Sequence, residues 1–166
     1  ATEVIKTLAD NLKKNKGSIV LFSTVAVKQG FPNHAIVSSA KGAIEGLTLA
    51  LAAEFAPNVR VNCIAPSLTN SKISNFLLKN EKVAEGIAKM HPMKRIGEGG
   101  DSASVAKFLL TDESSWITGQ ILGVDGGRSS VAWQFLKKQL NRYDEQDIHN
   151  NFNSFIKYKF NGCGKR

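Results

Sequence analysis

The sequence predicts an α/β fold in which helices cover a parallel β-sheet. Three short runs have the composition of strands: "SIVLFS" at 18–23, "VRVNCIA" at 59–65 and "ITGQILGV" at 117–124. Segments with helical periodicity separate these runs. Strands that alternate with helices indicate a parallel sheet, because each parallel connection must return to the starting edge of the sheet.

The first helix is predicted over Thr2–Lys14, and Gly17 ends this segment. Its apolar residues recur at helical spacing: Val4, Ile5, Leu8 and Leu12. The strand at 18–23 has no polar interruption before its final serine, which is typical of a strand buried on both faces. A polar loop that contains glycine, "TVAVKQGFPN", follows it.

A long helix is predicted over residues 34–55, with Asn33 as its N-cap. It is rich in alanine, serine and glycine, which let a helix lie close to a sheet or to a partner helix. Pro57 closes this helix. The run at 59–65 is predicted to be a second buried strand. Pro66 ends that strand, and the loop "PSLTNSK" follows it.

Two further helices are predicted, one over residues 73–89 and one capped by Asp101 or Ser102 that runs through Leu110. The basic loop "HPMKRIGEGG" joins them. The third strand follows and ends at a pair of glycines.

The composition changes near residues 129 and 130, so we predict a domain over 1–130 and a tail over 131–166. The tail is expected to be mostly helical or irregular. Its aromatic residues form either a partner-binding stripe or an extension that packs poorly, and the sequence leaves both open. They are Trp133, Phe135, Phe152, Phe155 and Phe160.

The overall composition indicates a globular protein: 42% of the 166 residues are hydrophobic and 22% are charged. No uninterrupted apolar run approaches the roughly 20 residues that span a bilayer, so no membrane partner is expected. The formal net charge is +8, but the lysines are scattered and accompany no nucleic-acid-binding motif. We therefore expect no nucleic-acid partner.

The two cysteines indicate a reduced, cytoplasmic protein. Cys63 stands in an apolar run and is predicted to be a buried free thiol, whereas Cys163 stands in the polar segment "NGCGKR". Neither has the spacing of a metal site.

Several ordered motifs over residues 2–131 resemble the C-terminal half of the short-chain dehydrogenase/reductase family. They are "GSIVLFST", "HAIVSSAKGAIEGLTLALAAEFAPNVRVNCIAPS" and "HPMKRIGEGGDSASVAKFLLTDESSWITGQILGVDGG". The resemblance implies part of a Rossmann-like, doubly wound parallel sheet that binds NAD or NADP. It also implies an oxidoreductase that acts on a small carbonyl or alcohol substrate, and a homo-oligomer formed through helices 1–14 and 34–55.

The family's functional positions can be carried over to this sequence one by one. Its lysine, which holds the nicotinamide ribose hydroxyls, falls on Lys41. Its serine falls on Thr24, with Ser23 just before it, and a threonine hydroxyl can still bond a substrate oxygen. The loop on the nicotinamide side falls on Pro66, Ser67, Leu68, Thr69, Asn70 and Ser71. Ser67 replaces the family's usual glycine.

Two departures from the family pattern affect the expected activity. The tyrosine position holds Val37, which cannot donate a proton, and loss of a general acid typically costs a factor of roughly 10² to 10⁴. No G-x-x-x-G-x-G occurs in the sequence, so these residues offer no glycine-rich turn for the cofactor's pyrophosphate. We therefore expect a truncated domain with little or no turnover as an isolated chain.

Five other polar side chains have a functional and a structural interpretation. His34 could replace the missing acid, although a surface position in the first helical turn is favoured. Ser38 and Ser39 could act as nucleophiles, although packing is favoured. Arg95 could grip a phosphate, but capping of its own loop is favoured, and Asp125 is expected to bond the backbone of its turn.

Two other functions remain open besides the oxidoreductase. One is a non-catalytic interaction module in which helices 1–14 and 34–55 form a dimer face. The other is a hydrolase or lyase that reuses the cleft without a cofactor.

Overall fold

A computed structural model describes residues 1–131 of the chain. Residues Ala1–Ser130 form one compact unit. The predicted tail lies outside the described residues, apart from Val131. The elements are α1 (Thr2–Lys14), β1 (Ser18–Phe22), α2 (Ala26–Gln29), α3 (Ala35–Phe55), β2 (Arg60–Pro66), α4 (Asn75–Leu78), α5 (Glu81–Lys89), α6 (Gly99–Leu110), the 3-10 turn η1 (Asp112–Ser114) and β3 (Ile121–Val124).

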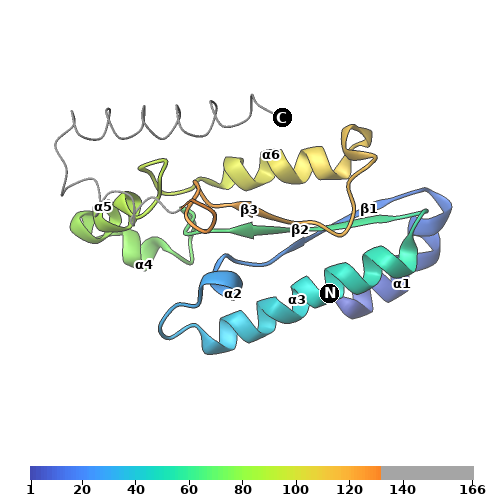
Figure 1. Cartoon of the computed structure of the whole chain (residues 1–166), viewed down its shortest axis with the longest axis horizontal. Helices are drawn as coiled ribbons and strands as arrows, with labels where there is room; N and C mark the ends of the chain where they lie inside the picture. The colour runs from blue at the N-terminus through green and yellow to red at the C-terminus, as the bar shows by residue number, and fades with distance from the viewer. Residues whose placement is uncertain (132–166) are drawn as a thin grey trace, which may run out of the picture. The chain divides into compact units, whose positions relative to one another are not determined.

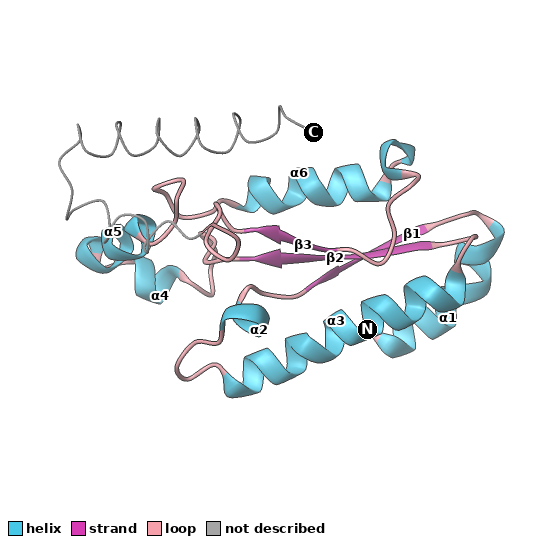
Figure 2. Cartoon of the chain, viewed as in Figure 1, coloured by secondary structure: helices cyan, strands magenta, loops and turns pink. Residues whose placement is uncertain are grey.

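The three strands form one parallel sheet in the order β1-β2-β3 (Figure 2). Ser18 pairs with Arg60 at the start of the first ladder, and Cys63 pairs with Ile121 at the start of the second. The α/β prediction with a parallel sheet is therefore confirmed. The pairing also brings the carboxyl ends of all three strands to one edge, where ligands bind in open parallel sheets.

Helices cover the two faces of the sheet, as Figure 1 shows, with α1 and α3 on one side and α6 on the other. The main core lies between the sheet and the α1/α3 layer. Its apolar side chains come from α1, α3 and the start of β2, and they are Ile5, Leu51, Ala52, Phe55, Val59 and Val61. Of the stripe predicted over Thr2–Lys14, Ile5 belongs to this core and Leu12 packs against it, whereas Val4 and Leu8 are exposed.

The prediction of strands buried on both faces holds for β2 but not for β1. The five central residues of β2 are buried, whereas β1 is half-buried and Phe22 is 44% exposed. The reason is topological. Among the described residues β2 is the central strand, and β1 lies at the edge of the sheet.

The helix predicted over residues 73–89 is in fact two helices, α4 and α5. Asn80 separates them with an extended backbone, and its side chain accepts a hydrogen bond from the Val83 N–H at the start of α5. The break is therefore an N-cap inside an otherwise helical pattern.

Other helix boundaries also differ from the prediction. The N-cap of α6 is Glu98, and Asp101 stands at the third helical position, where it completes a capping box. The N-cap of α3 is His34 rather than Asn33, which has a φ of 64°. The polar loop after β1 contains the short helix α2, which the sequence analysis missed.

Helix α3 is unusually exposed for its composition. Within residues 1–131 it alone is long and apolar enough to cross a membrane, with a mean hydropathy of 1.3 over an 18-residue window of which 17% is buried. Apolar helices that pack in soluble proteins meet the same criterion, so this observation is weak support for a membrane role. An exposed apolar face of this kind is typical of an interaction surface.

Candidate active site

A cavity of about 680 Å³ opens at the carboxyl ends of the strands. Its walls come from the segments that follow β1, β2 and β3 and from α4 and α5. The lining residues are Ser23, Thr24, Val25, Ala26, Phe31, Pro32, His34, Pro66, Ser67, Leu68, Thr69, Ser71, Ile73, Ser74, Leu77, Ile87, Met90 and Arg128. Seven of the nine positions carried over from the family are in this set, and Lys41 and Asn70 are not.

Ser23 and Thr24, the two hydroxyl residues after β1, differ in the hydrogen bonds that they make. Thr24 Oγ1 accepts the N–H of Ala26 at 3.3 Å, so its own proton can still be donated to a ligand. The hydroxyl of Ser23 is 2.6 Å from Glu45 Oε1 and donates to that carboxylate on α3. Ser23 is therefore held against α3, and Thr24 is the better placed of the two to meet a substrate oxygen.

Lys41 lies one turn beyond Val37 on α3, next to the end of β1. Its Nζ donates to the carbonyl oxygen of Phe22 at 2.8 Å. Only one of its three N–H donors is used in this contact. The contacts within residues 1–131 leave its other donors available to a ligand beside the cavity.

The loop after β2 is folded on itself by serine and threonine hydroxyls. Ser74 is buried and donates to the carbonyl of Thr69 at 2.6 Å, while it accepts the N–H of Ser71 at 2.9 Å. The hydroxyl of Thr69 bonds the carbonyl of Ser67 at 3.1 Å. These bonds fix residues 67–71 in one shape along the cavity wall.

Ser67 is hydrogen-bonded to the buried ring of His91, a contact that could not be predicted from the sequence. Its Oγ is 2.8 Å from His91 Nε2, and His91 Nδ1 is 2.8 Å from the carbonyl of Ile87. A carbonyl oxygen can only accept, so Nδ1 carries the proton, and in the neutral ring Nε2 accepts from Ser67. The bond ties the loop to the end of α5.

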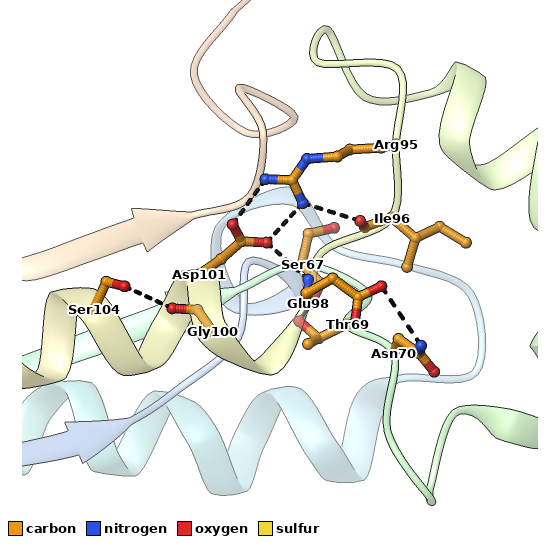
Figure 3. A network of polar contacts seen from close by, with 9 residues as sticks. All are labelled: Ser67, Thr69, Asn70, Arg95, Ile96, Glu98, Gly100, Asp101 and Ser104. Carbon is orange, nitrogen blue, oxygen red and sulfur yellow. Dashed lines mark hydrogen bonds and ion pairs between the residues drawn. The ribbon is translucent and has the colours of Figure 1, made fainter.

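The same loop is attached to the N-terminus of α6, as Figure 3 shows. Thr69 and Gly97 form an isolated parallel bridge, and Asn70 N–H donates to the carbonyl of Gly97 at 2.8 Å. Arg95 in turn holds Asp101 with two hydrogen bonds of 2.7 Å. The loop-capping interpretation of Arg95 is therefore confirmed.

The turn after β3 is organised by Asp125, as expected. Its carboxylate accepts the N–H of Gly127 at 2.9 Å and that of Ser129 at 2.8 Å, and it also accepts the hydroxyl of Ser129. Burial opposes the ionisation of Asp125, but these hydrogen bonds outweigh it and lower the pKa of the carboxyl. Arg128 lies in this turn and reaches the cavity wall.

The remaining candidate side chains have mainly structural contacts. His34 is exposed at the start of α3, with Nδ1 2.8 Å from the carbonyl of Pro32 and its ring edge against Phe31. Ser38 donates to the carbonyl of Ala26 at 3.1 Å and so packs α3 against α2. Val37 is 48% exposed and does not line the cavity.

Sequence reasoning missed three side chains of the site, namely Ser74, His91 and Arg128. The basic segment that contains His91 predicted a loop, and nothing in the pattern indicated that this ring would be 2% exposed. Cys63 is buried and free, as predicted, and Cys163 lies outside the described residues. Residues 1–131 contain no cluster of His, Cys, Asp or Glu that could hold a metal ion.

Comparisons with known proteins give a consistent result. A model of the family described as "Enoyl-(Acyl carrier protein) reductase" matches residues 1–129. "Tropinone reductase-like 3" of Erythroxylum coca is 37% identical over 127 residues, which are 76% of this chain and 49% of that protein. The chain thus spans about half the length of the curated relatives it matches.

Solved structures show the same likeness. A short-chain type dehydrogenase/reductase from Mycobacterium ulcerans superposes with a TM-score of 0.71 at 31% identity, covering 76% of this chain and 46% of that one. The structure described as "ElxO with NADP Bound" superposes with a TM-score of 0.70 at 30% identity, covering 76% and 52%.

Proposed function

Because the chain belongs to the short-chain dehydrogenase/reductase family, we propose that its protein transfers a hydride between NAD or NADP and a small carbonyl or alcohol substrate. The observation that carries the proposal is the cavity at the carboxyl ends of the strands. It brings Thr24 and the loop 66–71 to one wall, beside the helix that carries Lys41.

Each of these residues has a role in the proposal. The hydroxyl of Thr24 donates to the substrate oxygen, because its contact within residues 1–131 uses the oxygen as an acceptor and not the proton. Lys41 binds the ribose hydroxyls with its free N–H donors. The loop 66–71 meets the nicotinamide, with the backbone N–H of Thr69 directed at the carboxamide and the hydroxyl of Ser71 beside it. Bound NAD or NADP supplies the hydride.

The proton for the substrate oxygen has no obvious donor at the family's tyrosine position. Val37 stands there, by the resemblance of "HAIVSSAK" to the active-site helix. When the nucleotide-binding half of a relative is supplied in trans, the Val37→Tyr variant is therefore expected to raise the rate of carbonyl reduction by a factor of roughly 10² or more, the usual contribution of a general acid.

The oxidation of NADPH or NADH by a panel of aldehydes and ketones, measured with the nucleotide-binding half of a relative added in trans, tests this function. We expect Thr24→Ala to lower the rate strongly and Thr24→Ser to retain most of it, since the serine keeps the hydroxyl. Lys41→Met is expected to raise the KM for the cofactor, whereas Lys28→Gln, which removes an exposed charge on α2, is expected to leave it unchanged. Equal rates for Thr24→Ala and the parent protein would contradict the proposal.

The 166-residue chain tested by itself is expected to have little or no turnover, because its sequence contains no glycine-rich turn for the pyrophosphate. The nucleotide-binding half of a relative, added in trans, is expected to restore activity. Turnover by the isolated chain at the rate of the complemented sample would contradict this part of the proposal.

A second candidate function is assembly through α1 and α3. Both helices expose large apolar side chains, among them Val4 and Leu8 on α1 and Ile36 and Leu49 on α3. Such a surface is typical of an interface with another chain or domain. Sedimentation of the protein at several concentrations distinguishes a dimer, and Leu49→Arg is expected to shift it towards the monomer.

A further inference from the structure

Arg128 is held in the cavity wall by contacts of both its backbone and its side chain. The turn that Asp125 organises sets its backbone, and Gln29 on α2 donates to its carbonyl at 2.7 Å. The guanidinium lies over the ring of Phe31, with 4.7 Å between its central carbon and the ring centroid. The side chain thus bridges the segment after β3 and the segment after β1, at the rim of the space that a substrate would enter.

This cation has no carboxylate partner within residues 1–131. The ion pairs of the described part are Lys89–Glu85 and Arg95–Asp101. Of the five guanidinium N–H donors, the described contacts occupy one, in a long interaction with the sulfur of Met90 at 4.0 Å. Burial lowers the pKa of Arg128, with the charge of Asp125 acting in the opposite direction.

The rest of the cavity is suited to a ligand with an apolar body. Most of the lining side chains are apolar, the polar ones are mainly hydroxyls, and no aspartate or glutamate of residues 1–131 lines it. A half-buried guanidinium in such surroundings has lost part of its hydration. The charge of Asp125 acts on it without forming an ion pair, and that carboxylate is already bonded by Gly127 and Ser129 of its own turn. A ligand carboxylate would supply that charge and the acceptors that the fork of N–H donors needs.

We propose that the substrate carries a carboxylate-type anionic group on an apolar body and that Arg128 binds this group. The assignment rests on the proposed function, since it names the substrate class of the same cavity. Phe31 holds the guanidinium in place, and the hydroxyl of Thr24 remains available for the reacting oxygen.

A cofactor phosphate is the other source of an anion at this position. We assign Arg128 to the substrate, because Arg128 and Thr24 line the same cavity and Thr24 is expected to face the reacting oxygen. Inorganic phosphate therefore serves as a separate probe in the test.

The test measures binding rather than turnover, so it stands apart from hydride transfer. Benzoate and its neutral isostere benzamide are titrated into the ¹⁵N-labelled chain, without cofactor and at low ionic strength, and the amide shifts of residues 24–34 and 125–131 are followed. Benzoate is expected to bind about fivefold tighter than benzamide, as a charge-assisted hydrogen bond is stronger than a neutral one. Arg128→Gln is expected to abolish this preference, and Lys28→Gln, the matched control, to keep it.

Three results would overturn the assignment. Equal affinities for benzoate and benzamide in the parent chain would mean that Arg128 packs against Phe31 but binds no anion. Phosphate that binds at the same amides as tightly as benzoate would make the site a cofactor-phosphate site. A benzoate preference that survives in Arg128→Gln would place the anion elsewhere. Arg128→Lys keeps the charge but loses the fork of N–H donors, so it is expected to retain part of the preference for benzoate. This variant also serves as a second test if Arg128→Gln fails to fold.

Discussion

Arg95 and Asp101 are joined by two hydrogen bonds of 2.7 Å each, in the fork-to-fork geometry of an arginine–carboxylate pair. The same carboxylate accepts the N–H of Glu98 at 2.7 Å at the start of α6. Figure 3 shows this pair beside Thr69 and Asn70. Through Gly97, which pairs with Thr69, the pair supports the loop that forms one wall of the cavity. A contact outside the site therefore helps to set the shape of the site.

The stability that this pair provides is expected to be lost in acid. The hydrogen bonds from Arg95 and from Glu98 N–H hold the pKa of Asp101 far below its ordinary value. A lowered folded-state pKa stabilises the protein above the unfolded-state pKa, and this contribution disappears as the pH falls through the folded-state value. Melting temperatures of the parent and Asp101→Asn are expected to differ most near neutral pH and to converge towards about pH 2.

The control for this prediction is Asp10→Asn on α1, because Asp10 is exposed and its side chain has no hydrogen bond within the described residues. A difference between the parent and Asp101→Asn that stays constant from neutral to acid pH would contradict the prediction.

Two glycine-to-alanine substitutions are expected to have opposite effects on stability. Gly86 lies in the interior of α5, and an added Cβ would meet nothing within 4 Å, so Gly86→Ala is expected to stabilise by about 0.5–1 kcal/mol. Gly30 ends α2 with a φ of 64°, which strains any side chain, so Gly30→Ala is expected to destabilise. Urea denaturation measures both, and the same sign for both would contradict the local backbone described here.

Ser67→Ala is expected to destabilise the protein by about 1–3 kcal/mol, the cost of leaving a buried polar group without its partner. Nε2 of His91, which is 2% exposed, would lose the hydroxyl that donates to it. Ser104→Ala is the control, since this exposed hydroxyl on α6 bonds only the carbonyl of Gly100 within the described part of the chain. If the denaturant curves gave Ser67→Ala and Ser104→Ala the same free energy of unfolding, the hydrogen bond to His91 would contribute nothing to stability and the prediction would be wrong.

Cys63 is expected to be unreactive in the native protein. Its side chain is 0% exposed, and burial raises the pKa of the thiol, so little thiolate forms. In a Cys163→Ser background, an aromatic disulfide reagent is expected to modify Cys63 only as fast as the protein unfolds. Rapid reaction in native buffer at neutral pH would mean that the centre of the sheet is open to solvent.

The sequence predicted the sheet well because its strands carry strong local signals. The apolar run at 59–65 and the crossover helices were sufficient to predict β2 as a buried parallel strand. The edge position of β1 could not be predicted, because it depends on which strands pair rather than on the composition of the strand itself.

The candidate site was predicted only in part, for a similar reason. Thr24 and the loop 66–71 were identified by a resemblance of motifs, and the structure brings them to one cavity. His91 and Arg128 come from other parts of the chain, and only the fold brings them to Ser67 and Phe31. The helix break at Asn80 could not be predicted either, because asparagine also occurs inside helices.

The central claim is that the cavity wall formed by Thr24 and the loop 66–71, with Lys41 on the neighbouring helix, receives the nicotinamide end of the cofactor. The most direct measurement is a titration of the ¹⁵N-labelled chain with NADPH, in which the shift of every assigned backbone amide is followed. The account predicts saturable shifts that are largest at Thr24, Lys41 and residues 67–71 and that Lys41→Met weakens. Shifts that are absent from these residues, or that gather around Arg95 and Asp101 instead, would contradict it.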